Sequence, residues 1–158
     1  MRRRTIFSAC RTFRYVLWRE LDADNPRYAL FIGLNPSTAD EVADDPTIRR
    51  CKDFARRWGY GAVCVVNLFA YRATKPTELK AAPAPVGRAN DRWLVRVASK
   101  AAVVVAAWGV HGSFAGRDQA VISLLSVPLS YLAFTKGGHP RHPLYLKRTC
   151  VPRSWVLQ

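Results

Sequence analysis

The sequence predicts an α/β fold with three layers, α/β/α, around a mostly parallel central sheet that carries an antiparallel strand pair at its N-terminal side. Short, continuous apolar runs at 28–34, 62–68 and 101–109 are typical of strands buried on both faces. Segments with helical periodicity separate these runs, and strands that alternate with helices form parallel sheets. Because 158 residues suit one domain, and no repeat or linker divides them, we expect a single domain over 1–158.

The start of the chain predicts a basic arm followed by two strands. Residues 1–13 are basic without a clear period, so we interpret them as an arm outside the core of 14–146. Residues 14–21 are rich in aromatic and β-branched side chains, which favour strands. A turn-forming segment at 22–26 separates them from the strand at 28–34, so these two strands are expected to pair antiparallel.

The strongest helix signal begins at Asp45 and Pro46. Asp45 is typical of an N-cap, and proline is favoured at the first helical position. From 46 to 58 the apolar residues recur at intervals of three and four, which places them on one face of a helix. The remaining positions are strongly cationic and carry Arg49, Arg50, Lys52, Arg56 and Arg57.

The rest of the chain predicts two further helices and one further strand. Helices are expected over 91–100 and 115–126, and a last strand over 129–134. Residues 77–91 are interpreted mostly as loop, and 147–158 as a short basic tail.

The charge balance predicts a polyanionic partner. Lys and Arg number 25 against 11 acidic residues, which gives a formal net charge of +14. Such a surplus favours a nucleic acid or a nucleotide as the partner, although a cationic surface also aids solubility. Candidate phosphate contacts come from the helix at 46–58, with a solvated surface as the alternative, and from the loop around Gly137. These candidates are Arg49, Arg50, Arg56, Arg57, Lys136 and Arg141.

Cysteine spacing and hydropathy predict a cytoplasmic protein without a cofactor or metal. None of the four cysteines forms a Cys-x-x-Cys pair, so we expect reduced thiols, with a scattered metal cluster as the alternative. No apolar run approaches the roughly 20 residues that span a bilayer. Arg11, Arg14 and Arg19 interrupt the segment behind the basic start, so a basic arm is favoured over a signal or transit peptide.

Four polar loops follow the predicted parallel strands, at 35–38, 67–71, 108–111 and 139–143. The carboxyl ends of parallel strands share one edge of a sheet, and ligands of open α/β sheets bind there. All three histidines of the chain lie in the last two loops. We therefore expect the four loops to form one pocket.

The side chains of the first two loops suit a nucleobase. Asn35 carries a donor and an acceptor that can hold a water or read a base edge. Asn67 can bond the amide edge of a base, and Phe69 or Tyr71 can stack on it. Each residue also has a structural alternative: a turn bond for Asn35, a strand-end cap for Asn67, and core packing for the two aromatic rings.

The histidines and acidic residues offer acid–base chemistry. His139 or His142 can stabilise a developing anion or transfer a proton, whereas His111 is expected to be structural. Asp40, Asp44 and Asp45 form an acidic cluster that suits metal binding or general base catalysis. Helix capping is the alternative role for Asp45.

Four segments, at 33–40, 44–51, 66–74 and 139–145, resemble a bacterial and phage family of unknown function. The resemblance covers about residues 14–146 and includes the continuation Ser-Thr-Ala-Asp after the Asn-Pro pair. It implies no activity.

The order of motifs also resembles the uracil-DNA glycosylase superfamily. Its mismatch-specific branch carries Gly-x-Asn-Pro after the first parallel strand, which Gly33–Pro36 matches, and the resemblance implies that Asn35 positions the attacking water. It further implies that Asn67 reads a flipped base, and that His139 or His142, each followed by proline, contacts the base oxygen. No serine follows either His-Pro pair here, so the resemblance does not carry over insertion into the minor groove.

Together with the charge, this resemblance implies hydrolysis of the N-glycosidic bond of a base flipped into the pocket, from DNA rather than from RNA. Asn35 and Asp40 are expected to direct the water, and His139 or His142 to stabilise the departing base. Two alternatives stay open: a non-catalytic module that binds nucleic acid or a modified nucleotide, and an enzyme on a free small metabolite. The expected substrate-binding residues are Ser37, Thr38, Asn67, Phe69 and Tyr71.

Overall fold

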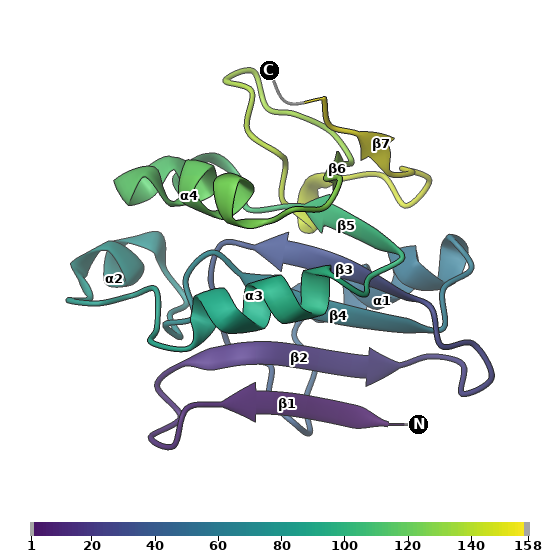
Figure 1. The fold of residues 1–158 in the computed structure, drawn as a ribbon, viewed down its shortest axis with the longest axis horizontal. Coiled ribbons are helices and arrows are strands. Elements are labelled where there is room, and N and C mark those ends of the chain that lie inside the picture. Colours follow the sequence, from purple (N-terminus) through teal and green to yellow (C-terminus); the bar gives the residue numbers. More distant parts are fainter. Residues whose placement is uncertain (1, 157–158) are drawn as a thin grey trace.

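Seven strands form a single sheet in the computed structural model, which describes residues 2–156 (Figure 1). The chain is α/β, as the sequence predicts. The strands are β1 (Arg3–Phe7), β2 (Arg14–Glu20), β3 (Tyr28–Gly33), β4 (Ala62–Asn67), β5 (Val103–Ala106), β6 (Ser130–Tyr131) and β7 (Arg153–Ser154). The α-helices are α1 (Pro46–Arg57), α2 (Pro76–Ala81), α3 (Asn90–Ala98) and α4 (Arg117–Leu124), and the 3₁₀ helices are η1 (Val110–Gly116) and η2 (Pro143–Tyr145).

The sheet is mixed, in the order β1-β2-β4-β3-β5-β6-β7. The central strands β4, β3, β5 and β6 run parallel, whereas β1, β2 and β7 run antiparallel to their neighbours. The sheet is therefore mixed rather than mostly parallel, and the antiparallel pair at its N-terminal side is formed by β1 and β2. The expected pairing of 14–21 with 28–34 is wrong, because β2 pairs with β1 and β4. The nearly fully buried β3 instead takes the centre, between two parallel partners.

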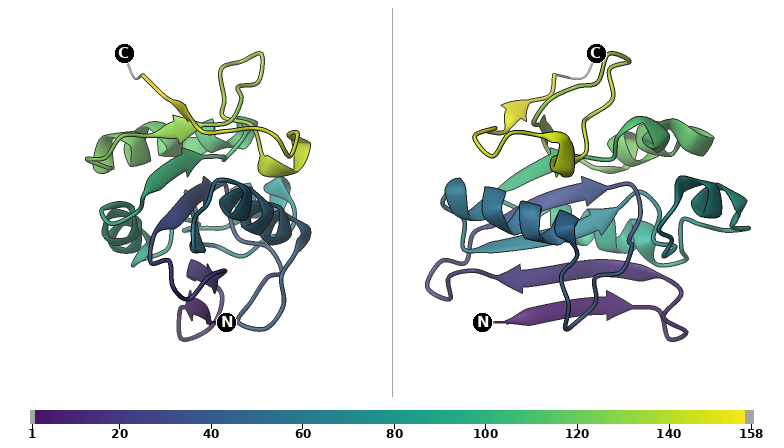
Figure 2. Two further views of the ribbon diagram at one scale, coloured as in Figure 1. Left: turned by 90° about the vertical axis from the view of Figure 1, so that its right-hand side faces the viewer. Right: turned by 180° about the vertical axis from the view of Figure 1, so that it is seen from behind.

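Helices cover both faces of the sheet (Figures 1 and 2). Helix α1 packs on one face through Ile48, Cys51 and Phe54, while α2, α3 and α4 bury apolar side chains in the core on the other face. The sequence signals for α1 are confirmed: Pro46 is its first residue, and the Asp45 carboxylate accepts a hydrogen bond from the Ile48 amide at 2.9 Å. None of the helices between residues 2 and 156 is long and apolar enough to cross a membrane.

Four elements differ from the predictions because their neighbours decide their conformation. β1 lies in the segment interpreted as a basic arm, where it pairs with β2, and β7 lies in the predicted tail, where it pairs with β6. Helix α2 occupies part of the predicted loop, and it is anchored by the fully buried Leu79. The strand expected over 129–134 is reduced to the two residues of β6.

Candidate functional site

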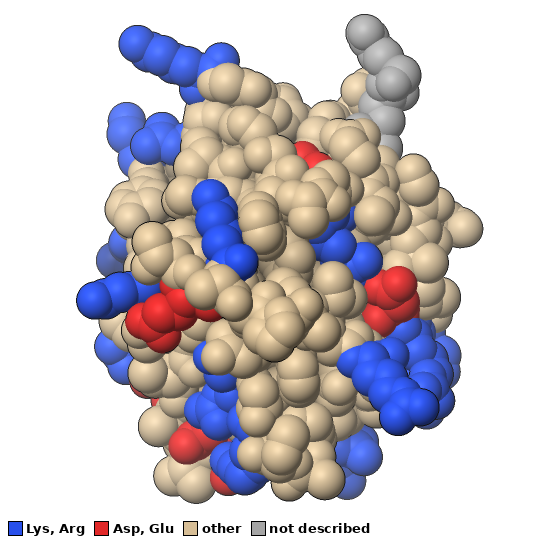
Figure 3. Space-filling model, turned by 90° about the vertical axis from the view of Figure 1, so that its left-hand side faces the viewer, with Lys and Arg blue, Asp and Glu red and all other residues tan. Residues whose placement is uncertain are grey.

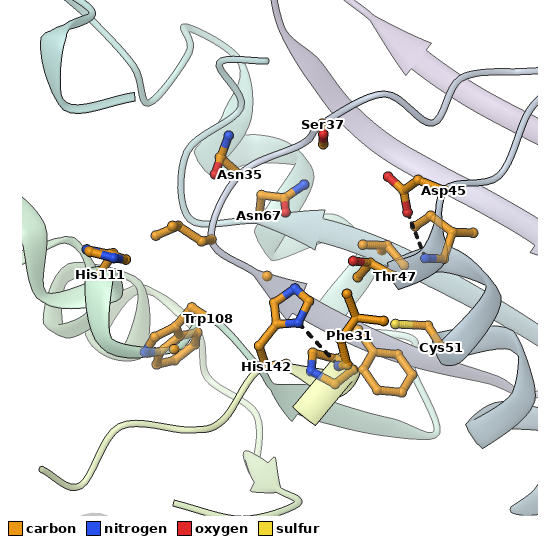
Figure 4. Close-up of a pocket in the computed structure, with 18 of the residues that line it drawn as sticks. Phe31, Asn35, Ser37, Asp45, Thr47, Cys51, Asn67, Trp108, His111 and His142 are labelled. Carbon is orange, nitrogen blue, oxygen red and sulfur yellow. Dashed lines mark hydrogen bonds between the residues drawn. The ribbon is translucent and has the colours of Figure 1, made fainter. Parts of the chain in front are cut away.

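A cavity of about 510 Å³ opens at the carboxyl ends of β3, β4 and β5 (Figure 4). Its walls come from the loop between β3 and α1, the start of α1, and the helices η1 and η2. Each of the four loops expected to form a pocket contributes at least one residue to the lining. The polar residues of the lining include Arg14, Asn35, Ser37, Asp45, Thr47, Asn67, His111 and His142.

Asn67 presents a buried amide to this cavity. The residue is 3% exposed, and its Nδ2 has no hydrogen-bond partner among the described residues. Its Oδ1 lies over Gly33, 2.8 Å from the position that a Cβ atom there would take. A buried amide without a partner costs about 1–3 kcal/mol, because it has given up its hydrogen bonds to water. Asn67 therefore keeps an unused donor at the edge of the cavity.

Asn35 is held by the loop that follows β4. Its Nδ2 donates to the carbonyl oxygens of Ala73 at 2.8 Å and Pro36 at 3.1 Å, with the Tyr71 carbonyl at 3.4 Å. These contacts match the turn role that the sequence left open for Asn35. They also fix the side chain with its donor occupied, so Oδ1 remains as an acceptor at the cavity wall.

Of the two candidate histidines, only His142 lines the cavity. Its Nδ1 accepts a hydrogen bond from the Leu144 amide at 3.2 Å, so the neutral ring carries its proton on Nε2. Figure 4 shows the other ring nitrogen turned into the cavity. Burial lowers the pKa of His142, which favours this neutral form. His139 instead lies in the turn after β6, where its backbone bonds Thr135.

The acidic residue on the cavity wall is Asp45, not the predicted Asp40. One oxygen of Asp45 caps α1, and Figure 4 shows Asp45, Ser37 and Thr47 on one side of the view and His111 on the other. The carboxylate of Asp40 accepts hydrogen bonds from the amides of Ala43 and Val42, which lower its pKa and hold the loop before α1. The cavity therefore offers a carboxylate from the helix cap.

Arg14 is a charged lining residue that sequence reasoning missed. It is 2% exposed, Nη1 donates to the Ala39 carbonyl oxygen at 3.1 Å, and Nε has no partner among the described residues. Burial lowers the pKa of this guanidinium to about 10. Its position at the start of an aromatic strand gave no signal, because an arginine there is normally a surface residue.

The other predicted substrate-binding residues are divided between the cavity and the core. Ser37 lines the cavity, whereas Thr38 is exposed and lies with Ser37 in a shallower hollow of about 310 Å³. Phe69 is fully buried against Phe114, and Tyr71 packs edge-on against Phe13. Neither aromatic ring lines the cavity, so both occupy the core positions that the sequence left as alternatives.

Several cations of α1 bind the chain itself. Arg50 donates to the Leu146 carbonyl oxygen and Arg57 to that of Arg148, each at 3.1 Å, so both hold the segment after η2. Arg49 donates to the Asp44 carbonyl oxygen. Arg56, Lys136 and Arg141 are exposed and do not line the cavity. Figure 3 shows the side of the molecule toward which β3 and β5 point. Lys and Arg side chains lie there in several separate places.

Metal-binding groups and disulfides are absent from residues 2–156. No three His, Cys, Asp or Glu side chains of this range are arranged to hold a metal ion, and the four cysteines are free thiols. Burial raises the pKa of Cys51, the cysteine that lines the cavity, so its thiol stays protonated.

Comparison with known proteins gives a family without an assigned activity. No curated protein and no solved structure matches the chain. One family model matches residues 14–144, a range that holds every cavity residue except Tyr145. The chain therefore belongs to the family described as "Protein of unknown function (DUF1643)".

Proposed function

We propose that this protein binds a nucleobase in the cavity and hydrolyses its N-glycosidic bond, with a three-layer arrangement like that of uracil-DNA glycosylases. The observation that carries the proposal is the unpartnered Asn67 amide, which is buried at the carboxyl end of a central strand. An amide offers one donor and one acceptor side by side, the complement of the amide edge of a pyrimidine or purine.

The cavity suits a flat heterocycle linked to a sugar. Its volume of about 510 Å³ is within the usual range for small-molecule sites and leaves room beyond a base. Phe31, Val65 and Trp108 supply apolar walls for the faces of the ring, while Asn67 bonds its edge. The cationic surface supports delivery of the base from a nucleic acid, DNA in the first instance, by flipping.

The chemistry follows from the groups that face one another across the cavity. Oδ1 of Asn35 holds a water, and the oxygen of Asp45 that does not cap α1 takes the proton as the water oxygen bonds C1′. The C1′–N bond breaks, and its electron pair stays on the base. The Nε2–H of His142 donates to the base oxygen on which negative charge develops, as a neutral electrophile.

Release of free base from DNA containing uracil, hypoxanthine, mispaired thymine or an alkylated base tests the proposal, with mass spectrometry as the readout. His142→Ala is expected to slow release by about 100-fold or more, the usual effect of removing one donor to a developing anion. The matched variant His139→Ala, outside the cavity, is expected to release base at the wild-type rate.

Absence of base release from every substrate, with salt-sensitive DNA binding intact, would contradict hydrolysis and favour a binding module. Turnover of a free nucleoside that DNA does not inhibit would instead favour an enzyme acting on a small metabolite.

A further inference from the structure

Arg14 differs from the other buried arginines of the described chain, which are Arg19 and Arg117. Arg19 is paired with Asp44 at 2.8 Å, and Arg117 with Asp91 at 2.5 Å. Among the described residues, Arg14 has no carboxylate within ion-pair distance, and its one hydrogen bond goes to the Ala39 carbonyl oxygen. A buried charge without an ion-pair partner is costly, so an unpaired guanidinium at a cavity wall points to an anionic ligand.

A β-bulge aims this guanidinium at the cavity. Ile6 pairs with Val16 and Phe7 with Arg14, so Tyr15 is an extra residue in β2. Neighbouring strand residues normally point to opposite faces, yet Tyr15 and Val16 both pack in the core beneath α3. Without the bulge, Arg14 would point into that core. With it, the side chain reaches the α1 face and the cavity wall.

The residues around Arg14 indicate which groups the ligand carries besides its anionic group. Asp45 lines the same cavity, so a bare anion would meet a carboxylate as well as the guanidinium. Ser37 and Thr47 add hydroxyl groups to this side. A ligand that joins an anionic group to hydroxyl donors, as a sugar phosphate does, satisfies Arg14 and the carboxylate together.

We propose that Arg14 is the phosphate-binding residue of the cavity, and that the ligand is a nucleotide whose phosphate pairs with this guanidinium while its base lies against Asn67. The position proposed for the base rests on the proposed function, whereas the position proposed for the phosphate rests on Arg14 alone. The phosphate comes either from a free nucleotide or from the strand that holds a flipped base.

Calorimetric titration with uracil, uridine, uridine 5′-monophosphate, a short uracil-containing DNA strand and inorganic phosphate tests the proposal. The 5′-monophosphate is expected to bind about tenfold or more tightly than uridine, the usual gain from hydrogen bonds to a charged group. Arg14→Met is expected to abolish that gain. Arg92→Met, which removes one exposed cation from α3, is expected to keep it.

Melting temperatures distinguish a ligand-binding role of Arg14 from a structural one. Arg14→Met is expected to melt at or above the wild-type temperature, because it removes an unpaired buried charge, and inorganic phosphate is expected to raise the melting temperature of the wild type only. If Arg14→Met fails to fold, Arg14→Lys supplies the test. Lysine keeps the positive charge but lacks the paired donors of the guanidinium, so this variant is expected to retain part of the affinity that the 5′-monophosphate gains over uridine.

The outcomes distinguish the two proposals. Equal affinity for uridine and its 5′-monophosphate refutes the phosphate site and leaves the proposed function intact. Phosphate binding that requires Arg14, without binding of any base-containing ligand, refutes the proposed function and supports the site. The ligand that loses more affinity in Arg14→Met, the mononucleotide or the DNA strand, identifies the source of the phosphate.

Discussion

Replacing Asp44 by asparagine is expected to destabilise the protein far more than the loss of a surface ion pair. The Asp44 carboxylate accepts hydrogen bonds from Arg19 at 2.8 Å and Lys52 at 2.9 Å, and Arg3 lies 3.9 Å away. Arg19 is 1% exposed, so the variant leaves a buried guanidinium without its counter-charge. Arg19 also donates to the Asp40 carbonyl oxygen, which ties this cluster to the loop that carries Asn35 and Ser37.

The magnitude follows from burial and from the contacts that remain. Removing one partner of a buried ion pair costs about 3–5 kcal/mol. We expect the lower value, because Arg19 keeps neutral acceptors in the Trp18 carbonyl oxygen at 3.1 Å and Thr5 Oγ1 at 3.3 Å. A loss of about 3 kcal/mol lowers the melting temperature of a protein of this size by about 6–12 °C. Asp53→Asn is the matched control, since its pair with the exposed Arg148 contributes only about 0–1 kcal/mol.

The pH dependence of the free energy of unfolding gives an independent check on the role of Asp44. Burial raises the pKa of Asp44, but hydrogen bonds from Lys52 and Arg19 outweigh burial, so the pKa lies below its ordinary value. Such a carboxylate stabilises the fold fully above its unfolded pKa of about 3.9, and the contribution is lost as pH falls through the folded pKa. Urea unfolding at neutral pH and in acid measures both effects. The reasoning is refuted if Asp44→Asn and Asp53→Asn differ by less than about 1 kcal/mol at neutral pH.

Three further predictions concern the cavity and the thiols. Gly33→Ala places a Cβ 2.8 Å from Oδ1 of Asn67 and is expected to weaken ligand binding about tenfold, with little change in melting temperature; calorimetry and thermal unfolding check this. His142 is expected to titrate below its ordinary pKa of about 6.5 in an NMR titration, and base release is expected to fall as its protonation breaks the bond from the Leu144 amide. A hydrogen bond from Ser8 lowers the pKa of Cys10 to about 7, whereas burial raises that of Cys64 to about 12. Iodoacetamide at neutral pH is therefore expected to label Cys10 in the folded protein and Cys64 only after unfolding, as mass spectrometry of peptides would show.

Local patterns made the central elements predictable. The continuous apolar runs that form β3 and β4 are typical of strands buried on both faces, and Asp45 with Pro46 marks the start of α1. The meeting of Asn35, Asn67 and His142 in one cavity followed from the parallel order of these strands. The sequence alone was sufficient to predict an element where the residues that carry the pattern are the same residues that form the element.

The remaining features depend on distant partners. β1 and β7 become strands because a sheet edge is free beside them, and the register that produces the bulge at Tyr15 depends on pairing between β1 and β2. The position of Arg14 follows from that bulge, so no local pattern around it could reveal its role. The cations of α1 suggested a phosphate-facing strip, but Arg50 and Arg57 bind carbonyl oxygens of a segment far along the chain.

The cavity draws its walls from residues between Arg14 and Tyr145, which span the full range of the family match and one residue beyond it. Contacts between residues so far apart in sequence form late, because the entropy of closing long loops must be overcome first. Partly folded chains therefore lack the binding site, and a ligand selects only the completed fold. At a free concentration of 100 Kd, a ligand would add about 2.7 kcal/mol of stability. A genuine substrate can thus be recognised before its chemistry is known, as a compound that lets denatured protein refold in higher yield.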